Sequence, residues 1–209
     1  MGKEVNVAVF ASGGGSNFQS LIDKKEEGKL HVNLAVLVGN NSKAKAFERA
    51  HNYNIPTLHI APSHFEDENV YTEKLLSELE SRNIDLIVLA GYMKMIPKAM
   101  VQKYHNRIIN IHPALLPSFG GVGMYGKRVH QAVLDYGAKV SGITVHFVDE
   151  EYDRGPIILQ ETAKVLDDDD ADSLAARVLK VEHGNYWRAV EAFAQGTIRV
   201  EGRKVIGTV

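Results

Sequence analysis

The stretch that decides the fold runs Val7-Ala8-Val9-Phe10-Ala11-Ser12-Gly13-Gly14-Gly15-Ser16-Asn17. Its apolar half belongs to a run that starts at residue 5, and such an unbroken run predicts a buried strand. Three glycines between two serines then mark a turn, and residues 17–27 have the spacing of an amphipathic helix. A strand, a glycine-rich turn and a helix in this order predict the opening unit of an α/β sheet.

The alternation of strands and helices continues beyond this opening unit. Further strands are predicted at residues 34–39, 56–60 and 84–90, with helices at 44–53 and 68–82 between them. The longer strands are continuous apolar runs, which are typical of strands that are covered on both faces. The sequence therefore predicts an α/β fold with a doubly wound, mostly parallel sheet.

The second half of the chain has a less regular pattern. It predicts helices at 97–104, 127–136 and 173–194, strands at 108–111, 141–148 and 157–165, and a polar strand or tail at 197–206. Strands 141–148 and 157–165 flank the turn 149–156, so we expect an antiparallel hairpin there. Residues 113–126 form a long loop rich in proline and glycine, and long ordered loops are usually functional.

Composition limits the classes of partner. The chain has 209 residues, 44% of them hydrophobic, which suffices for one domain with a sizeable core. A net charge of −2 predicts no nucleic-acid or membrane partner, and the absence of cysteine excludes thiol catalysis and disulfides. The apolar run before Ser12 is too short for a signal peptide. We expect a cytoplasmic monomer or homodimer that uses only small-molecule substrates.

The glycine-rich loop is a candidate phosphate site. Its backbone amides and the positive end of the following helix dipole would face a ligand bound there. The loop contains neither Gly-x-Gly-x-x-Gly nor Gly-Lys-Ser/Thr, so a monophosphate fits it better than a dinucleotide or a nucleoside triphosphate. The alternative is a tight turn in which Ser16 or Asn17 caps the helix.

Asn110, His112 and Asp153 form a candidate catalytic triad. Asn110 and His112 are two residues apart at a strand end, so their side chains would project to one side. An imidazole can act as acid or base near neutral pH, a nearby carboxylate would favour its protonated form, and an amide can donate to a developing oxyanion. Taken singly, each residue also has an ordinary reading as a turn or packing residue. Together they are typical of acyl-type group transfer that needs no serine or cysteine nucleophile.

Five motifs in register carry a resemblance to a known family. They are Ser12-Gly13-Gly14-Gly15-Ser16-Asn17, Leu89-Ala90-Gly91-Tyr92-Met93, Asn110-Ile111-His112-Pro113-Ala114-Leu115-Leu116-Pro117, Val145-His146-Phe147-Val148 running to Asp153-Arg154-Gly155-Pro156-Ile157-Ile158-Leu159-Gln160, and Arg177-Val178 with Glu182-His183. Over nearly its whole length the chain resembles the phosphoribosylglycinamide formyltransferases, which have the Rossmann-like formyltransferase fold. The resemblance implies a single domain, residues 1–209, with a ribonucleotide-binding half (1–90), a catalytic and folate-binding half (91–195) and a C-terminal strand or tail (196–209).

The resemblance also implies an activity, which is formyl transfer from 10-formyltetrahydrofolate to the primary amine of glycinamide ribonucleotide, without a metal. His112 would donate a proton, Asp153 would raise the pKa of His112, and Asn110 would stabilise the oxyanion. The implied ribonucleotide site consists of Gly15, Ser16, Asn17, Met93, Lys180 and Glu182. The implied folate site consists of Leu89, Met93, Lys94, Met95, Ile96, Asn110, Asp149, Glu150, Glu151, Tyr152 and Asp153.

Several features depart from the family pattern, and rival functions stay open. Lys94 stands where many members have arginine, and Leu179 replaces the polar residue expected near the ribonucleotide. Glu68 stands where a basic residue often meets the glutamate tail of the folate, and the loop 120–128 is longer than in the forms compared. The rivals are a formyltransferase acting on another amine, a formyltetrahydrofolate hydrolase, and a non-catalytic protein that binds a phosphorylated metabolite.

Overall fold

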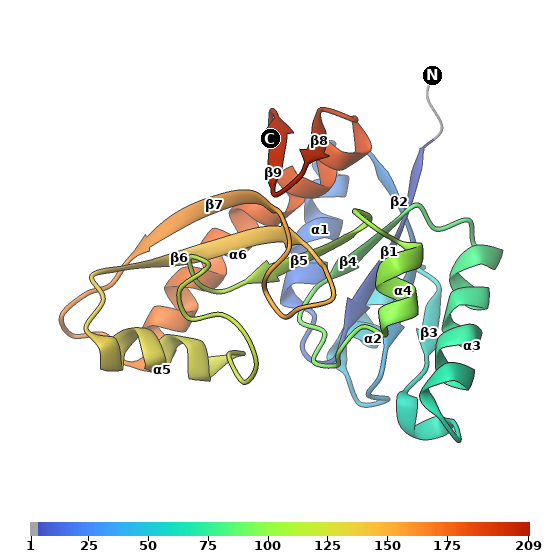
Figure 1. Cartoon of the computed structure of the whole chain (residues 1–209), viewed down its shortest axis with the longest axis horizontal. Helices are drawn as coiled ribbons and strands as arrows, with labels where there is room; N and C mark the ends of the chain where they lie inside the picture. The colour runs from blue at the N-terminus through green and yellow to red at the C-terminus, as the bar shows by residue number, and fades with distance from the viewer. Residues whose placement is uncertain (1–3) are drawn as a thin grey trace. The chain divides into compact units, whose positions relative to one another are not determined.

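The computed structural model describes residues 4–209. The chain forms two compact units, Met1–Ile109 and Asn110–Val209, whose ribbons run from blue to green and from green to red in Figure 1. The division falls inside strand β5 (Ile108–His112), whereas the sequence predicts one domain whose halves meet at residue 90. That single-domain organisation stays a prediction.

The first unit has the predicted alternation of strands and helices. Its strands lie in the order β3-β2-β1-β4, and the pairs β1 with β2, β1 with β4 and β2 with β3 are all parallel. The elements are β1 (Val5–Ala11), α1 (Ser16–Glu26), β2 (Val32–Gly39), α2 (Lys45–Asn52), β3 (Thr57–His59), the short helix η1 (Pro62–His64), α3 (Glu68–Ser81), β4 (Leu86–Leu89) and α4 (Lys98–Lys103).

The apolar run that opens the chain forms the centre of this sheet. Val7, Ala8, Val9 and Phe10 are each 0% exposed, as expected of a strand covered on both faces. Phe10 pairs with Val38 of β2 and with Leu89 of β4, so the carboxyl ends of three parallel strands meet at one edge. Ligands of open α/β sheets bind at this edge.

The second unit supplies the antiparallel strands that the sequence predicts. Its elements are the end of β5, α5 (Lys127–Tyr136), β6 (Val140–Phe147), β7 (Ile157–Lys164), α6 (Ala171–Ala194), β8 (Ile198–Glu201) and β9 (Lys204–Gly207). β6 pairs antiparallel with β7, and α6 packs on both strands and on α5. The predicted single polar strand or tail at 197–206 is wrong, because β8 and β9 form an antiparallel hairpin that turns at Gly202.

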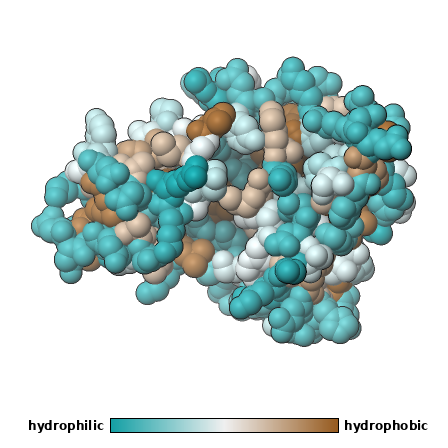
Figure 2. Space-filling model, turned by 90° about the horizontal axis from the view of Figure 1, so that it is seen from below, coloured by the Kyte–Doolittle hydropathy of each residue, from teal (hydrophilic) through white to brown (hydrophobic). Residues whose placement is uncertain are grey.

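The face that Figure 2 shows is mostly hydrophilic, and its hydrophobic residues form small separate groups. The large exposed apolar side chains include Val122 at 86% and Tyr136 at 82% exposure. Val122 lies in the loop before α5, and Tyr136 is the last residue of α5. Most apolar side chains are therefore in the cores of the two units, and the loop 120–128 has an exposed tip.

Candidate functional site

The glycine-rich loop at the end of β1 has the geometry of an anion site. Helix α1 starts at Ser16 with Gly15 as its N-cap at φ 69°, and within the described chain this cap makes no side-chain hydrogen bond. The alternative in which Ser16 or Asn17 caps the helix is therefore wrong. A Cβ built on Gly13 or Gly14 meets nothing within 4 Å, so open space adjoins the loop. The first amides of a helix lack intrahelical partners and attract anions.

Helix α2 and the residues before it hold the loop from behind. The amide of Ala46 donates to the Gly13 carbonyl at 3.2 Å, the Nε of Arg49 donates to the Gly14 carbonyl at 2.8 Å, and Asn41 Nδ2 donates to the Ser12 carbonyl at 3.3 Å. Because protein donors bind these three carbonyls, the loop is held in place and these oxygens face the protein. An Arg49 guanidinium beside the loop also adds positive charge there.

Ser12 joins the loop to the segment predicted to bind folate. Its amide donates to the Gly91 carbonyl at 3.1 Å, and its Oγ accepts from the Met93 amide at 2.8 Å and donates to Asn40 Oδ1. Met93 and Met95 are 53% and 57% exposed, while Ile96 is buried. Exposed methionines on a fixed segment offer an adaptable surface to a flat ring.

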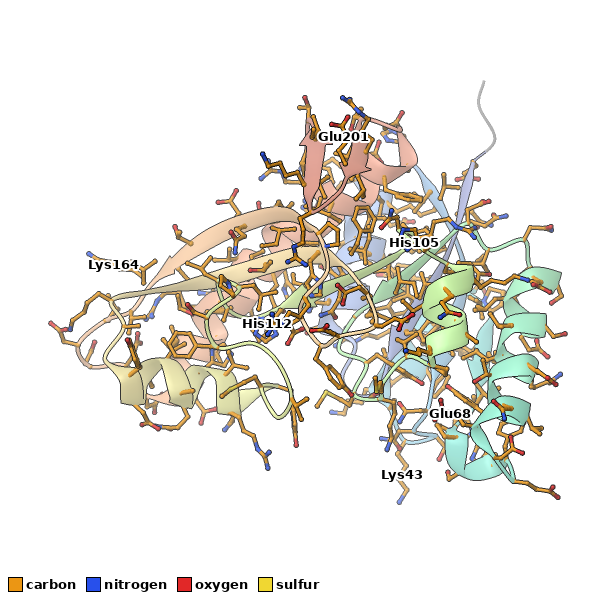
Figure 3. All side chains as sticks on the ribbon, in the orientation of Figure 1. Lys43, Glu68, His105, His112, Lys164 and Glu201 are labelled. Carbon is orange, nitrogen blue, oxygen red and sulfur yellow. The ribbon has the colours of Figure 1, made fainter. Side chains whose placement is uncertain are left out.

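Glu68 lies at the start of α3, on the exposed surface of the first unit, where Figure 3 labels it. The Asp67 side chain before it caps α3 by accepting from the amides of Asn69 and Val70. Glu68 is thus an exposed acidic residue in the first turn of α3. Its relation to a folate tail stays a prediction.

The second unit brings Asn110, His112 and Asp153 together through a fourth residue, His146. Asp153 Oδ2 lies 3.5 Å from His112 Nδ1, and Asp153 Oδ1 lies 3.6 Å from His146 Nε2. Asn110 Nδ2 lies 3.2 Å from the same His146 Nε2. His112, which Figure 3 labels, is 3% exposed, and His146 is 2% exposed. The carboxylate therefore faces two buried imidazoles, and Asn110 contacts one of them.

The hydrogen bonds of His146 define how Asn110 is held. His146 Nδ1 lies 2.8 Å from the Phe147 carbonyl, and since a carbonyl only accepts, this nitrogen carries a proton. In the neutral ring Nε2 is then an acceptor for the Asn110 amide. The Asn110 side chain is fixed through one N–H, and its second N–H can donate to an oxyanion.

Burial dominates the charge state of His112. Desolvation lowers the pKa of its imidazole below the ordinary value, the Asp153 carboxylate and the Phe119 carbonyl oppose this, and His146 adds to the lowering. Asp153 acts in the predicted direction, but the net pKa is lowered because the burial effect is larger. For Asp153, burial raises the pKa of the carboxyl, yet contact with His146, the charge of His112 and the Gly121 amide together lower it.

The turn before Asp153 is ordered by its own side chains. Asp149 Oδ1 accepts from the Glu151 amide at 3.0 Å, and Asp153 has φ 56°, a left-handed conformation that aspartate tolerates. A Cβ on Gly155 would lie 1.7 Å from the Phe147 carbonyl oxygen, so only glycine allows the turn to approach β6. Tyr152 is 46% exposed. The closure of this turn over a folate stays a prediction.

The predicted ribonucleotide residues of α6 do not share one face of the helix. Lys180 is exposed and Glu182 is 7% exposed, and residues two apart on a helix point in nearly opposite directions. At most one of them can belong to a given contact surface. Glu182 is the buried one, which suits a site residue better.

Two positioning residues were missed from the sequence, Phe119 and Thr144. The Phe119 carbonyl lies 2.8 Å from His112 Nε2. The Thr144 hydroxyl is 0% exposed, accepts from the Leu116 amide and from Gln160 Nε2, and donates to the Ala114 carbonyl. A threonine inside an apolar strand is a signal for such a role, because a buried hydroxyl needs partners. A backbone carbonyl leaves no such signal.

Comparison with known proteins defines the class. Residues 5–190 match the family described as formyl transferase. The chain belongs to the formyl transferase family. No helix within residues 4–209 combines the length and the apolar character needed to cross a lipid bilayer.

Several phosphoribosylglycinamide formyltransferases are similar to the chain. The chloroplastic one of Vigna unguiculata is 44% identical over 192 residues, which is 92% of this chain and 62% of that protein, so the chain spans less than two thirds of this relative. The one of Bacillus subtilis (strain 168) is 38% identical over 86% of this chain and 89% of its own length. The crystal structure of glycinamide ribonucleotide transformylase 1 from Symbiobacterium toebii matches with a TM-score of 0.94 and 36% identity, covering 100% of this chain and 96% of that one.

Proposed function

We propose that this chain transfers the formyl group of 10-formyltetrahydrofolate to the primary amine of glycinamide ribonucleotide, a step of purine biosynthesis. The observation that carries the proposal is the cluster in which Asp153 lies beside the buried His112 and Asn110 lies beside the buried His146. The chain is also similar over most of its length to enzymes named for this reaction.

The ribonucleotide phosphate would bind at the loop after β1. Support comes from the open space beside Gly13 and Gly14, the N-terminus of α1 and the Arg49 guanidinium bound to the Gly14 carbonyl. The pterin ring would lie on residues 93–96, where exposed Met93 and Met95 flank a backbone that Ser12 fixes. Both proposed binding surfaces belong to the first unit.

The transfer would pass through a tetrahedral intermediate. The amine nitrogen forms a bond to the formyl carbon, and the formyl oxygen becomes an oxyanion that accepts from Asn110. Removing one such donor costs about 3 to 4 kcal/mol in enzymes where it has been measured. The intermediate then breaks the bond between the formyl carbon and the folate nitrogen.

His112 would move the proton that this exchange requires. Its lowered pKa keeps the ring neutral near pH 7, so it can take the proton that the attacking amine loses. The resulting imidazolium lies 3.5 Å from the Asp153 carboxylate, which stabilises it, and gives the proton to the departing folate nitrogen. Protons balance, because the amine supplies what the leaving group receives.

The test is to incubate the protein with 10-formyltetrahydrofolate, with and without glycinamide ribonucleotide, and to measure released tetrahydrofolate. Release only with the ribonucleotide supports the proposal. Release without any acceptor identifies a hydrolase, release only with another amine such as a sugar nucleotide identifies a different transferase, and binding without release identifies a non-catalytic protein. The predicted cytoplasmic location and the predicted monomer or homodimer stay predictions.

A further inference from the structure

The turn Phe119–Gly121, within the long loop between β5 and α5, contacts both His112 and Asp153. The Phe119 carbonyl is hydrogen bonded to His112 Nε2 at 2.8 Å, and the Gly121 amide donates to Asp153 Oδ2 at 2.8 Å. We infer that this turn is a positioning device, in which the Phe119 carbonyl keeps a proton on His112 Nε2 and thereby assigns the catalytic proton to His112 Nδ1. The functional part of this inference rests on the proposed formyl transfer.

The Phe119 carbonyl oxygen can only accept a hydrogen bond. It has lone pairs and no proton, so its ring partner must be the donor. His112 Nε2 is therefore protonated in the neutral and in the cationic ring alike. The nitrogen that gains and loses a proton is Nδ1, and it faces Asp153 Oδ2.

The Asp153 carboxylate and the Phe119 carbonyl favour opposite tautomers of the neutral His112 ring. A carboxylate beside Nδ1 favours a proton on that nitrogen, and charge-assisted hydrogen bonds are about twice as strong as neutral ones. At 3.5 Å, however, the contact from Nδ1 to Asp153 is longer than a normal N–H···O bond of about 2.7 to 3.2 Å. The Phe119 contact at 2.8 Å is within that range, so the carbonyl decides the neutral tautomer.

The backbone of this turn adopts an unusual conformation where it makes these contacts. Phe119 has φ 54°, a left-handed conformation that residues with a side chain rarely adopt. Its ring packs edge-on against Tyr136 of α5 with the ring centroids 5.9 Å apart, which helps to hold it. Strain that the surrounding structure maintains is typical of functional positions.

Leu116 and Asp153 closely approach the backbone of Gly120. A Cβ on this residue would lie 2.4 Å from Leu116 Cδ2 and 3.3 Å from Asp153 Cβ. Leu116 is 6% exposed and has little room to move. The missing side chain of Gly120 thus lets Asp153 come near enough for the Gly121 amide to orient its Oδ2 toward His112.

The charged and titratable groups around His112 do not change this assignment. Asp153 and His146 face it from the turn before β7 and from β6, and His130 of α5 is close enough to interact with its charge. His130 is 5% exposed, and its pKa is lowered by burial and by the charge of His112, so it is neutral near pH 7. None of them contacts His112 Nε2 within the described chain as the Phe119 carbonyl does.

The direct test is nuclear magnetic resonance of the protein labelled with 15N-histidine, in the absence of substrates. Two-bond correlations distinguish the two neutral tautomers, and the signals of His112 are identified by their loss in His112→Gln. We expect a proton on Nε2 above the titration and a response of Nδ1 to acid. The same tautomer is expected in Asp153→Asn, because the carbonyl and not the carboxylate sets it. A neutral His112 with its proton on Nδ1 would overturn the inference.

A second arm uses Gly120→Ala with Val122→Ala as the matched control, since Val122 lies two residues away and is 86% exposed. A displacement of about 1 Å at a catalytic group can cost about 100-fold in rate. We expect about that loss of kcat in Gly120→Ala, a shifted pH profile and a nearly unchanged KM for the ribonucleotide, with no effect in the control. Unchanged kcat and pH profile in a folded Gly120→Ala would contradict the inference.

The two arms separate this inference from the proposed function. If the protein transfers no formyl group but shows the Nε2 tautomer, the function fails and the device stands. If it transfers the group with the other tautomer, the function stands and the device fails. Should Gly120→Ala not fold, the tautomer of the unsubstituted protein and of Asp153→Asn still decides.

Discussion

The two glycine-rich turns of this protein use the same residue for opposite purposes. At Gly13 and Gly14 the missing side chain leaves open space beside the N-terminus of α1. At Gly120 the missing side chain is filled by the protein itself, because Leu116 and Asp153 occupy the space that a Cβ would take. The first turn is open to solvent, and the second is closed around the groups proposed to move the proton.

The largest expected effect is loss of the groups that the second turn positions. His112→Ala and Asp153→Asn should each remove most turnover, by about 100-fold or more, since general acid–base catalysis contributes about 10² to 10⁴. Binding of the ribonucleotide, measured by calorimetry, should survive because the first turn is untouched. Near-full activity in either variant would show that these residues are not the catalytic ones.

The next effect separates two glycines within the first turn. Gly15 has φ 69°, and a Cβ there would lie 2.8 Å from Ala46 Cβ, so Gly15→Ala should destabilise the fold by about 1 to 3 kcal/mol. Thermal or denaturant unfolding measures this loss. A Gly15→Ala protein as stable as the parent would mean that α2 does not press on the loop as described.

Gly14→Ala is the counterpart, because its Cβ meets nothing within 4 Å. Stability should be unchanged, while the methyl group enters the space proposed for the phosphate. We expect the KM for the ribonucleotide to rise about tenfold, which corresponds to about 1.4 kcal/mol, with kcat nearly unchanged. An unaltered KM would place the phosphate elsewhere.

A smaller effect concerns pH and the buried histidines of the second unit. The pKa values of His112 and His130 are lowered in the native state, mainly by burial, so below about pH 6.5 the unfolded chain binds protons that the native chain resists. Stability should therefore be fully present above pH 6.5 and fall as the pH drops, by at most about 1.4 kcal/mol per pH unit for each group. Asp153, with its lowered pKa, acts only near and below pH 4.

Denaturant unfolding between pH 7 and pH 5 measures this slope. His130→Gln should flatten it, whatever the substitution does to stability at pH 7, because one of the two resisting groups is gone. His51→Gln is the control, since His51 is exposed on α2. An equal slope in His130→Gln and the parent would exclude His130 as a source.

The smallest effect belongs to a glycine that has neither role. Gly184 is exposed within α6, and its Cβ would meet nothing within 4 Å. Gly184→Ala should stabilise the protein by about 0.5 to 1 kcal/mol, because alanine loses less backbone entropy in a helix. Turnover should not change. A loss of activity here would show that α6 has a tighter constraint than its surface suggests.

Much of the architecture could be predicted from the sequence, because burial leaves a periodic trace. The runs around Val9 and Val88 predict covered parallel strands, and the turn between β6 and β7 predicts a hairpin, as the structure has them. The hairpin β8–β9 was missed because its strands are short and half-exposed, so neither strand has an apolar run.

The candidate site also has parts that the sequence predicts and parts that it does not. Asn110, His112 and Asp153 are side chains with distinctive chemistry, and their residue types and order along the chain predict a site. The contribution of Phe119 is a carbonyl, which every residue has, and the pKa of His112 depends on burial that no short motif specifies. Backbone groups that contact a side chain cannot be predicted from the sequence, because every residue has them.

The hydrogen bonds of the Thr144 hydroxyl indicate where a peptide can be inserted into this protein. The Thr144 hydroxyl of β6 is hydrogen bonded to the Ala114 carbonyl and the Leu116 amide. Gln160 of β7 donates both to this hydroxyl and to the Leu116 carbonyl. The base of the long loop is thus anchored, while its tip at Val122 projects into solvent. A reporter peptide or an affinity tag inserted at that tip would lie outside the anchored segment, which makes residue 122 a suitable point for labelling the protein near the groups proposed to move the proton.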